Sequence, residues 1–492
     1  MRSRSLPGAI VFLAFLAGGL LVGCGEDRLP PIQELGTAPE HLSDVDISSA
    51  IDGALVVDER VSAEDLNVSS VDGVVTLSGT VPNLLAEERA LEIARSTKGV
   101  VSVIDRITVE PAERSDSEIE LDVLGALTLD PATESYEVDV EVDDGVVTLT
   151  GNVQSWAEKW LAADVASTVT GIRGVENEID VDYAEERADH EIETDIEGRL
   201  ESDVWVDDGL ISVDVDHGQV MLTGVVGSAS EKWRAERDAL VAGVSSVEND
   251  LEIKWWARNE MRRAERFADM TDEEIRAAVD DALLFDPRVL SLAVQVSVEN
   301  GVATLGGTVA SLKAKRAAVE DAENTLGVWR VVDNLEVRPA DEIADAELEE
   351  MVSDALQRDI YVDRDQIEVE VRGGIAYLDG SVDSQFEKSR AESVVGTVPF
   401  VVEVMNNIYV DAEWPLKSDE EIREDIEHEF YWNPWLMGSN IDVSVENGVA
   451  TLTGTVDSWF ETSIARQEAL KAGAREVRSE LDVLYGSPPY IP

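Results

Sequence analysis

The side chains best suited to chemistry are few and scattered along this 492-residue chain. Its four histidines, His41, His190, His217 and His428, show no His-x3-His spacing, and the one cysteine, Cys24, has no second thiol to pair with. Transition-metal sites need several imidazole or thiolate ligands brought together, so no metal centre is expected. Neither a nucleophile–base pair nor a glycine-rich phosphate loop is present. The sequence therefore predicts no catalytic residue and no cofactor.

Carboxylates are abundant, and one run of them resembles a calcium loop. Asp139, Glu141 and Asp143 alternate with valines ahead of Gly145. The glycine comes one place later than in an EF-hand loop, and the alternation places all three acids on the solvent face of a strand. We interpret the run as a solvated strand face.

The charge balance is strongly acidic, with 103 acidic residues against 39 basic residues and a formal charge of −64. A field of this sign opposes attraction to nucleic acid or to an anionic bilayer, so no nucleic-acid partner is expected. A hydrophobic content of 44% excludes disorder as the reason for the acidity. Adaptation to salt is an alternative reason, since a Debye length of about 3 Å at 1 M salt would relieve the self-repulsion.

The amino-terminal segment reads as an export signal. Arg2 and Arg4 precede an apolar run from Ala9 to Val22, which is too short to favour a membrane-spanning helix. We expect a signal peptide over residues 1–23, followed over residues 24–42 by a proline-containing tether.

The cleavage region, Leu21-Val22-Gly23-Cys24, resembles the lipobox of bacterial lipoproteins. The resemblance implies cleavage before Cys24 and acylation of its thiol and new amino group, which would anchor the protein stably to a membrane. By the same resemblance, Gly25 favours the outer membrane, facing the periplasm. The alternative is an ordinary signal peptide with an incidental cysteine.

Aromatic residues near helix ends are the candidate binding residues. An exposed tryptophan at a helix start can insert into a bilayer interface or into a partner's groove. The alternative is a staple that packs over the sheet or against a neighbouring repeat. The residues proposed to contact lipid or a partner are Trp156, Trp432, Trp435, Trp459 and Phe460.

The rest of the chain is built on one repeated hairpin, seen at residues 441–456. Apolar residues alternate on both sides of Asn447-Gly448, a pair that favours a type I′ turn because both residues tolerate positive φ. Gly454, six residues beyond the turn, is interpreted as a close approach of a helix backbone or a bulge. The turn glycines of the six copies are Gly73, Gly145, Gly218, Gly301, Gly374 and Gly448.

Each copy of the hairpin lies within the order helix, hairpin, helix, strand. First helices open at capping boxes such as Ser418…Glu421 and stop at pairs such as Asp286-Pro287. The predicted N-caps of the second helices are Asn83, Ser155, Ser228, Ser311, Ser384 and Ser458, and the glycines predicted near their ends are Gly99, Gly171, Gly243, Gly327, Gly396 and Gly473.

This order predicts an α+β fold of six αββαβ units, each a three-stranded sheet with two helices on one face and a crossover to the last strand. We expect these units to follow one another as beads in series. A basic segment at 255–270 is interpreted as a linker helix between two groups of three units, or alternatively as a docking site for an acidic partner or lipid headgroup. The predicted units are 43–111, 114–184, 187–254, 271–339, 341–413 and 417–486, followed by a tail at 487–492.

The repeated Gly-Val-x-Thr-Leu-x-Gly hairpin, the Val-x-Asn-x-Leu-x-Val strand and the αββαβ order resemble tandem BON domains, the module of osmotic-shock and nodulation-associated envelope proteins. The chain departs from this pattern at Asp105 and Ser479, where other copies have asparagine, and at Gly373-Gly374 in the fifth hairpin.

The resemblance implies a non-enzymatic envelope protein that binds phospholipid or envelope partners and supports envelope integrity or osmotic protection. A structural, self-associating role is the alternative, because αββαβ units also resemble the ring-building domains of secretins. The sequence specifies neither the ligand nor the oligomeric state.

Overall fold

The fold is described from a computed structural model of the whole chain. Within it, Met1–Leu42 and Ser43–Pro492 are two separate units, and the second of these carries all the repeats. The structure describes residues 42–483 except 62, 131, 134–136, 184–186, 255–269, 290–292, 340, 342, 412–416, 437–438 and 457–458.

Each of the first three repeats has a helix, a hairpin, a second helix and a closing strand, as predicted. Repeat 1 comprises α1 (Asp44–Val57), β1 (Leu66–Val71), β2 (Val74–Val81), α2 (Leu84–Arg95) and β3 (Ser102–Val109). Repeat 2 comprises α3 (Asp116–Leu129), β4 (Glu137–Asp143), β5 (Val146–Val153), α4 (Trp156–Ser167), β6 (Gly174–Asn177) and β7 (Asp180–Val181). Repeat 3 comprises α5 (Asp189–Ser202), β8 (Ile211–Asp216), β9 (Gln219–Val226), α6 (Ala229–Asp238) and β10 (Ser246–Ile253).

The last three repeats follow the same order. Repeat 4 comprises α8 (Asp272–Phe285), β11 (Val294–Glu299), β12 (Val302–Val309), α9 (Leu312–Glu323) and β13 (Arg330–Val337). Repeat 5 comprises α10 (Asp345–Arg358), β14 (Ile367–Arg372), β15 (Ile375–Val382), α11 (Gln385–Thr397), β16 (Glu403–Asn406) and β17 (Tyr409–Val410). Repeat 6 comprises α12 (Asp419–Trp432), β18 (Asn440–Glu446), β19 (Val449–Val456), α13 (Trp459–Lys471) and β20 (Glu476–Val483).

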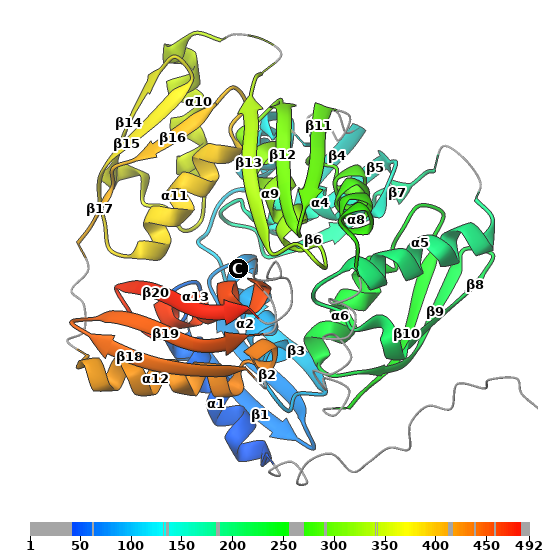
Figure 1. Cartoon of the computed structure of the whole chain (residues 1–492). Helices are drawn as coiled ribbons and strands as arrows, with labels where there is room; N and C mark the ends of the chain where they lie inside the picture. Colours follow the sequence, from blue (N-terminus) through cyan, green and yellow to red (C-terminus); the bar gives the residue numbers. More distant parts are fainter. Residues whose placement is uncertain are drawn as a thin grey trace, which may run out of the picture. The chain divides into compact units, whose positions relative to one another are not determined.

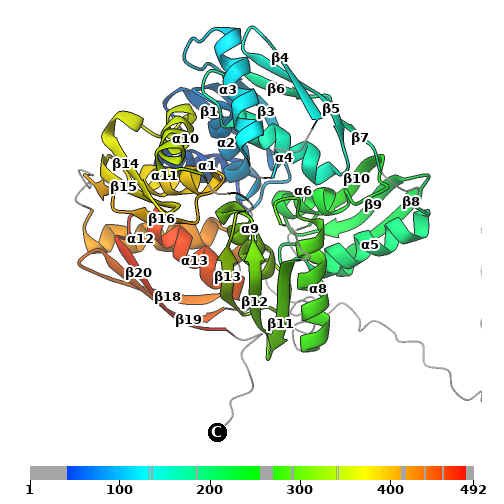
Figure 2. The ribbon, with the colours of Figure 1, turned by 90° about the horizontal axis from the view of Figure 1, so that it is seen from above.

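The second strand of the hairpin is the centre of every sheet. In repeat 4, β12 pairs antiparallel with β11 and parallel with β13, so the connection through α9 is the predicted crossover. Figures 1 and 2 show α8 and α9 together on one face of this sheet. In repeats 2 and 5 the third strand is divided into two short pieces that both pair with the centre strand.

Each repeat buries its own small apolar core under the two helices. First helices contribute residues spaced by four, such as Ile192, Ile196 and Leu200 on α5, which lie on one face of the helix. The centre strand β9 contributes Val220 and Leu222. Each buried side chain of this size contributes roughly 1.5–3 kcal/mol. Second helices present mainly alanine to the core, which lets them lie close to the sheet.

A carboxylate at the first position of the first helix fastens this helix to the hairpin turn. The Asp189 carboxylate accepts the backbone N–H groups of His217 and Gly218, both at 3.0 Å. These hydrogen bonds, from His217 and then Gly218, hold the pKa of Asp189 below its ordinary value. Both turn residues have positive φ, as the predicted type I′ turn requires. The same 29-residue spacing to the turn glycine recurs at Asp44, Asp116, Asp272, Asp345 and Asp419.

The second glycine of the hairpin marks a close backbone approach, but the approaching segment is not a helix. A Cβ at Gly454 would lie 2.0 Å from the carbonyl oxygen of Asn440, at the start of β18. The corresponding distance at Gly307, to the oxygen of Ala293, is 2.2 Å. The backbone at the start of the first strand therefore lies against this glycine and leaves no room for a side chain.

Helix boundaries follow the predicted capping chemistry, with exceptions. Ser418, Thr271 and Ser115 form capping boxes at first helices, and Asn83, Ser155, Ser228, Ser311 and Ser384 cap second helices. Ser458 lies outside the described residues.

Gly396 does lie near the end of α11, but the prediction that it forms a left-handed C-cap was wrong, because it lies inside the helix and Phe400 adopts the positive φ instead. The other five glycines near second-helix ends do have positive φ: Gly99, Gly171, Gly243, Gly327 and Gly473.

The expectation of beads in series was also wrong, since Ser43–Pro492 forms one compact unit. The predicted linker helix at 255–270 lies outside the described residues apart from Met270. Among the described residues, no helix combines the length and the apolar content needed to cross a bilayer.

Neighbouring glycines on β12 give a matched test of the close approach. Gly307→Ala should lower the free energy of unfolding of repeat 4 by at least about 2 kcal/mol, because the new methyl group meets a backbone oxygen and φ is +106°. Gly306→Ala, with no atom within 4 Å of the new Cβ, should be neutral or slightly stabilising. Urea unfolding followed by circular dichroism measures both, and equal effects would contradict the assignment.

Candidate functional site

The segment that follows each first helix carries the same turn in all six repeats. The helix ends at an aspartate or asparagine, whose side-chain oxygen accepts the backbone N–H of the residue two positions later; for Asp203 and Trp205 the distance is 2.6 Å. Such a turn stops the helix and fixes the direction of the next residues. The capping residues are Asp58, Asp130, Asp203, Asp286, Asp359 and Asn433.

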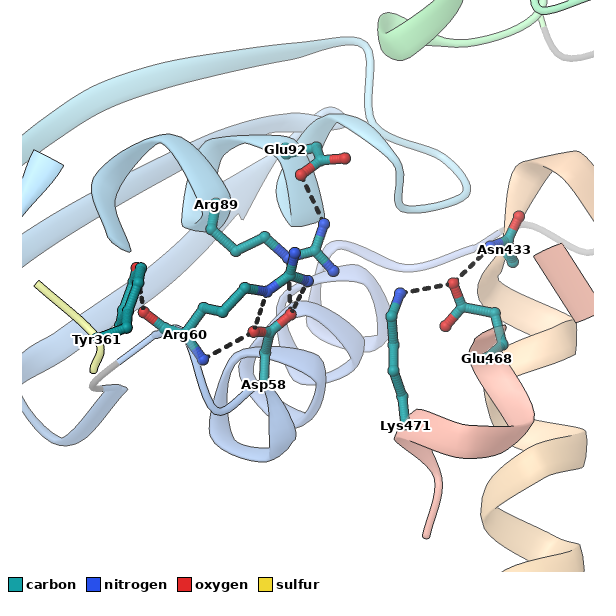
Figure 3. A network of polar contacts seen from close by, with 8 residues as sticks. All are labelled: Asp58, Arg60, Arg89, Glu92, Tyr361, Asn433, Glu468 and Lys471. Atoms are coloured by element: carbon teal, nitrogen blue, oxygen red, sulfur yellow. Dashed lines mark hydrogen bonds and ion pairs between the residues drawn. The ribbon is translucent and has the colours of Figure 1, made fainter. Parts of the chain in front are cut away.

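Most of these caps also bind a cation on a second helix. The Asp58 carboxylate forms ion pairs with Arg60 and with Arg89 of α2, both at 2.7 Å. Arg89 also pairs with Glu92 at 2.6 Å (Figure 3). Burial alone would raise the pKa of Asp58, but hydrogen bonds and charges from Arg60 and Arg89 hold it well below its ordinary value. Equivalent pairs join Asp203 to Arg234 and Asp359 to Arg390.

Repeat 6 departs from this charge pattern. Its cap is the neutral Asn433, which donates to Glu468 of α13 at 3.2 Å, and Glu468 also accepts from Lys471 at 2.8 Å (Figure 3). The helix position of Glu468 is occupied by a buried carboxyl in repeats 3 and 4 as well, at Asp238 and Asp321. Burial and then Asp286 raise the pKa of Asp321 to about 9, so it is protonated at neutral pH.

The caps lie where repeats meet. Lys98, just beyond α2, donates its backbone N–H to the carbonyl of Trp432, the last residue of α12, at 3.0 Å. At the equivalent positions, Thr170 donates its hydroxyl to the Arg358 carbonyl at 3.2 Å. The N–H of Leu326 likewise donates to the Ser202 carbonyl at 2.8 Å.

This single contact therefore joins repeat 1 to repeat 6, repeat 2 to repeat 5 and repeat 4 to repeat 3. Isolated antiparallel bridges at Val169↔Asp359 and Asp203↔Thr325 accompany the last two contacts. The pairs are nested, so the second half of the chain pairs with the first half in reverse order.

Aromatic residues two positions after the cap fill these junctions. Trp205 of repeat 3 packs edge-on against Trp435 of repeat 6, with ring centroids 4.9 Å apart, and its indole N–H donates to Asn324 of repeat 4 at 3.2 Å. Tyr361 of repeat 5 donates its hydroxyl to the backbone carbonyl of Arg60 in repeat 1 at 3.1 Å.

A cavity of about 140 Å³ lies at the junction of repeats 1 and 6. Helices α1 and α2 form one side, and α12 with the 3-10 turn Pro434–Leu436 and α13 form the other. Its aromatic lining is Trp205, Trp432 and Trp435, and its acidic lining is Asp58, Glu92, Glu429 and Glu468, with Arg89 and Lys471 as the lining cations.

Glu429 has the most unusual environment in the cavity. Burial, followed by the negative charge of Glu468, raises its pKa to about 7. Asp425 adds to this rise, whereas Lys471 and Lys417 oppose it. A carboxyl with this pKa carries a proton part of the time at neutral pH.

The structure brings two of the five proposed aromatic contacts to this cavity. Trp432 is half-buried in its lining, with its indole N–H donating to His428 at 3.1 Å, and Trp435 is only 7% exposed. Trp156 lies elsewhere and donates to the Val244 carbonyl of repeat 3 at 2.9 Å.

Three predicted site residues lie wholly or partly outside the part of the chain that the structure describes. Trp459 begins α13, but its side chain and that of Phe460 lie outside the described residues, as does Cys24.

The sequence reasoning missed Trp205 and Glu429. Trp205 follows its cap Asp203 by the same two positions as Trp435 follows Asn433, so an alignment of the repeats could have linked the two tryptophans. Glu429 carries no comparable signal, because one glutamate among many on an acidic helix is not distinctive.

One surface group could hold a cation by its composition. Asp189, Asp216 and His217 place one ligand atom each within 4.8 Å of one another. Both Asp189 oxygens already accept backbone N–H groups of the hairpin turn, so we assign this group to the turn.

The nested pairing predicts a specific cross-link between repeats 2 and 5. Thr170→Cys with Arg358→Cys, in a Cys24→Ser background, should oxidise to an intramolecular disulfide, because these residues flank the Val169↔Asp359 bridge. Ser202 is the equivalent of Arg358 in repeat 3, so Thr170→Cys with Ser202→Cys is the matched control and should stay reduced. Mass spectrometry of the oxidised proteins distinguishes the two, and equal cross-linking would contradict the pairing.

The raised pKa of Glu429 predicts that the folded state loses stability as the pH rises. Below about pH 4.5 the folded and unfolded states both hold its proton; as the pH rises through about 7 the stabilisation of the protonated folded form is lost. The free energy of unfolding of the wild type therefore declines between pH 4 and pH 8, and Glu429→Gln should remove up to about 3 kcal/mol of this decline. Glu424→Gln, 65% exposed on the same helix, is the control. Parallel pH profiles of unfolding for wild type and Glu429→Gln would refute the assignment.

Comparison with known proteins places the repeats in a family. The chain is 32% identical over 145 residues to the osmotically-inducible protein Y of Escherichia coli K12, covering 28% of this chain and 72% of that protein. It is 30% identical over 177 residues to the outer membrane lipoprotein DolP of Haemophilus influenzae, covering 35% of this chain and 90% of that protein.

Solved structures match at lower identity. CdsD, a structural protein of the type III secretion system of Chlamydia trachomatis, is 17% identical, with 42% of this chain and 90% of that chain covered and a TM-score of 0.12. The PrgH periplasmic domain is 14% identical, with 41% of this chain and 98% of that chain covered and a TM-score of 0.11.

The BON domain sequence model matches six segments, which together account for most of the chain. They are residues 43–111, 115–183, 188–254, 271–339, 344–412 and 418–485. With these matches and two relatives at 30% identity or more, the chain belongs to the BON-domain family.

Proposed function

We propose that this chain is a non-enzymatic, lipid-anchored protein of the cell envelope, tethered to the outer membrane through acylated Cys24. Its BON repeats bind phospholipid headgroups or envelope partners and support the envelope under osmotic stress. The observation that carries this proposal is the similarity to an outer membrane lipoprotein over 90% of its length, together with a second relative described as osmotically inducible.

The packing of the repeats bears on how phospholipid could be bound. Trp435 is buried and Trp156 is engaged with repeat 3, so direct insertion of these rings into a bilayer requires neighbouring repeats to separate. Trp432 lines the cavity and is half-buried, so part of it is accessible without this separation. Binding of a headgroup at the docked surface therefore agrees better with the structure than insertion of several tryptophans.

Self-association is the second candidate function, and a specific observation favours it. The helix-end contact is used three times between repeats of one chain, which makes it a ready mode of association between BON units. Under this second candidate function, the surfaces through which the repeats associate are occupied by other repeats of the same chain, and the chain acts as a structural module.

Flotation with liposomes separates the two candidates. The chain from residue 24 onward with Cys24→Ser should float with phospholipid vesicles if the repeats bind headgroups, and Trp432→Ala should reduce the floated fraction. Trp459→Ala and Trp435→Ala test two more of the proposed contacts, with thermal unfolding as the check that each variant is folded.

The flotation experiment is repeated across salt concentrations. Electrostatic contributions to binding are then separated from others, because the Debye length falls from about 10 Å at 0.1 M to about 3 Å at 1 M. Absence of flotation at every salt concentration, together with concentration-dependent oligomers in sedimentation, would overturn lipid binding and support self-association.

A further inference from the structure

The cavity between repeats 1 and 6 combines two features that recognise the same kind of ligand. The first is aromatic: Trp205, Trp432 and Trp435 all contribute to its lining. The indole face is the best aromatic partner for a cation, and alkylated ammonium groups are bound in this way by clusters of aromatic rings. The fold already uses such a contact next to the cavity, where the Lys98 ammonium lies 4.1 Å from the ring centre of Tyr431.

The second feature is an excess of negative charge. Four carboxyl groups line the cavity, against the cations Arg89 and Lys471. Counting Arg60, which also pairs with Asp58, one carboxyl still exceeds the number of cations, and the excess is a full negative charge when Glu429 is ionised, as it mostly is at pH 8. A cavity with this balance favours a positively charged ligand over an anion.

The hydrogen bonds show which carboxyl is available. Arg89 is held between Asp58 and Glu92, and Lys471 is held by Glu468. Within the described part of the chain, the Glu429 carboxyl makes no ion pair or hydrogen bond. Glu429 is thus the group whose charge a bound cation would neutralise, and both lining cations are already engaged by carboxylates.

The size of the cavity suits a small molecule or the end of a larger one. A volume of about 140 Å³ has room for a group such as trimethylammonium with a short substituent. Positions equivalent to Trp432 and Trp435 carry Leu129 and Ala132 in repeat 2 and Phe285 and Arg288 in repeat 4. The pair of tryptophans around a cap is therefore a property of repeat 6.

We propose that this cavity binds an alkylated ammonium group, with the ring faces of Trp432 and its neighbouring tryptophans around the alkyl substituents and the Glu429 carboxylate next to the charge. The group can belong to a free solute or to a phospholipid headgroup. The proposal does not depend on the membrane anchor or on the role in the envelope.

Isothermal titration calorimetry at pH 8 and low salt tests the proposal on the chain from residue 24 onward with Cys24→Ser. The probes are tetramethylammonium chloride, glycine betaine and vesicles of phosphatidylcholine. Saturable binding of at least one probe is expected, whereas 3,3-dimethylbutanol, a neutral molecule with the shape of choline, should not bind. Binding to the soluble probes assigns the group to a free solute, and binding to vesicles alone assigns it to a headgroup.

Two variants locate the binding. Trp432→Leu and Glu429→Gln should each weaken it about tenfold, as the loss of one cation–π or charge contact implies. Glu424→Gln on the exposed side of the same helix should change it less than about twofold. Circular dichroism confirms that each variant is folded. No binding of any probe, equal binding of the neutral alcohol, or binding unaffected by Trp432→Leu and Glu429→Gln would overturn the proposal.

Discussion

The aspartate or asparagine that ends each first helix is the contact on which the arrangement of the repeats depends. Its side chain fixes the turn, and in repeats 1, 3 and 5 it also binds an arginine of the second helix. In repeats 3, 5 and 6 the residues on either side of it form the junction with another repeat: the last helical residue offers a carbonyl, and the aromatic residue two positions beyond the cap offers a side chain. Local capping chemistry and long-range docking therefore meet at one position.

The local structure could be predicted from the sequence because each element is specified by nearby residues. Positive φ at Asn447 and Gly448 follows from their residue types, and Ser155 and Ser418 cap helices through atoms within three residues. Agreement among six copies strengthened each assignment. Gly396 misled the prediction because the expected glycine was displaced by Phe400, and residue type alone does not show which of two close positions adopts positive φ.

The docking of the repeats could not be predicted in this way. Trp205 and Trp435 are 230 positions apart, and although they share a place in the repeat, the same place is Ala132 in repeat 2 and Arg288 in repeat 4, so the repeat pattern does not show which two repeats dock. Docking also changes which aromatic residues are exposed: Trp435, proposed as an exposed contact, is buried between repeats. The acidic composition concealed Glu429 in a similar way, since its environment depends on Glu468 of a second helix and on burial at the cavity.

Docked repeats differ from independent beads in their size in solution, and small-angle X-ray scattering of the chain from residue 24 onward, with Cys24→Ser, measures this difference most directly. If the helix ends pair the repeats as described, the folded part should have a radius of gyration of about 22–25 Å, whereas six separate units in a row would give roughly 40 Å or more. A value in the larger range, at a salt concentration that screens the acidic surface, would contradict the nested pairing and with it the cavity between repeats 1 and 6.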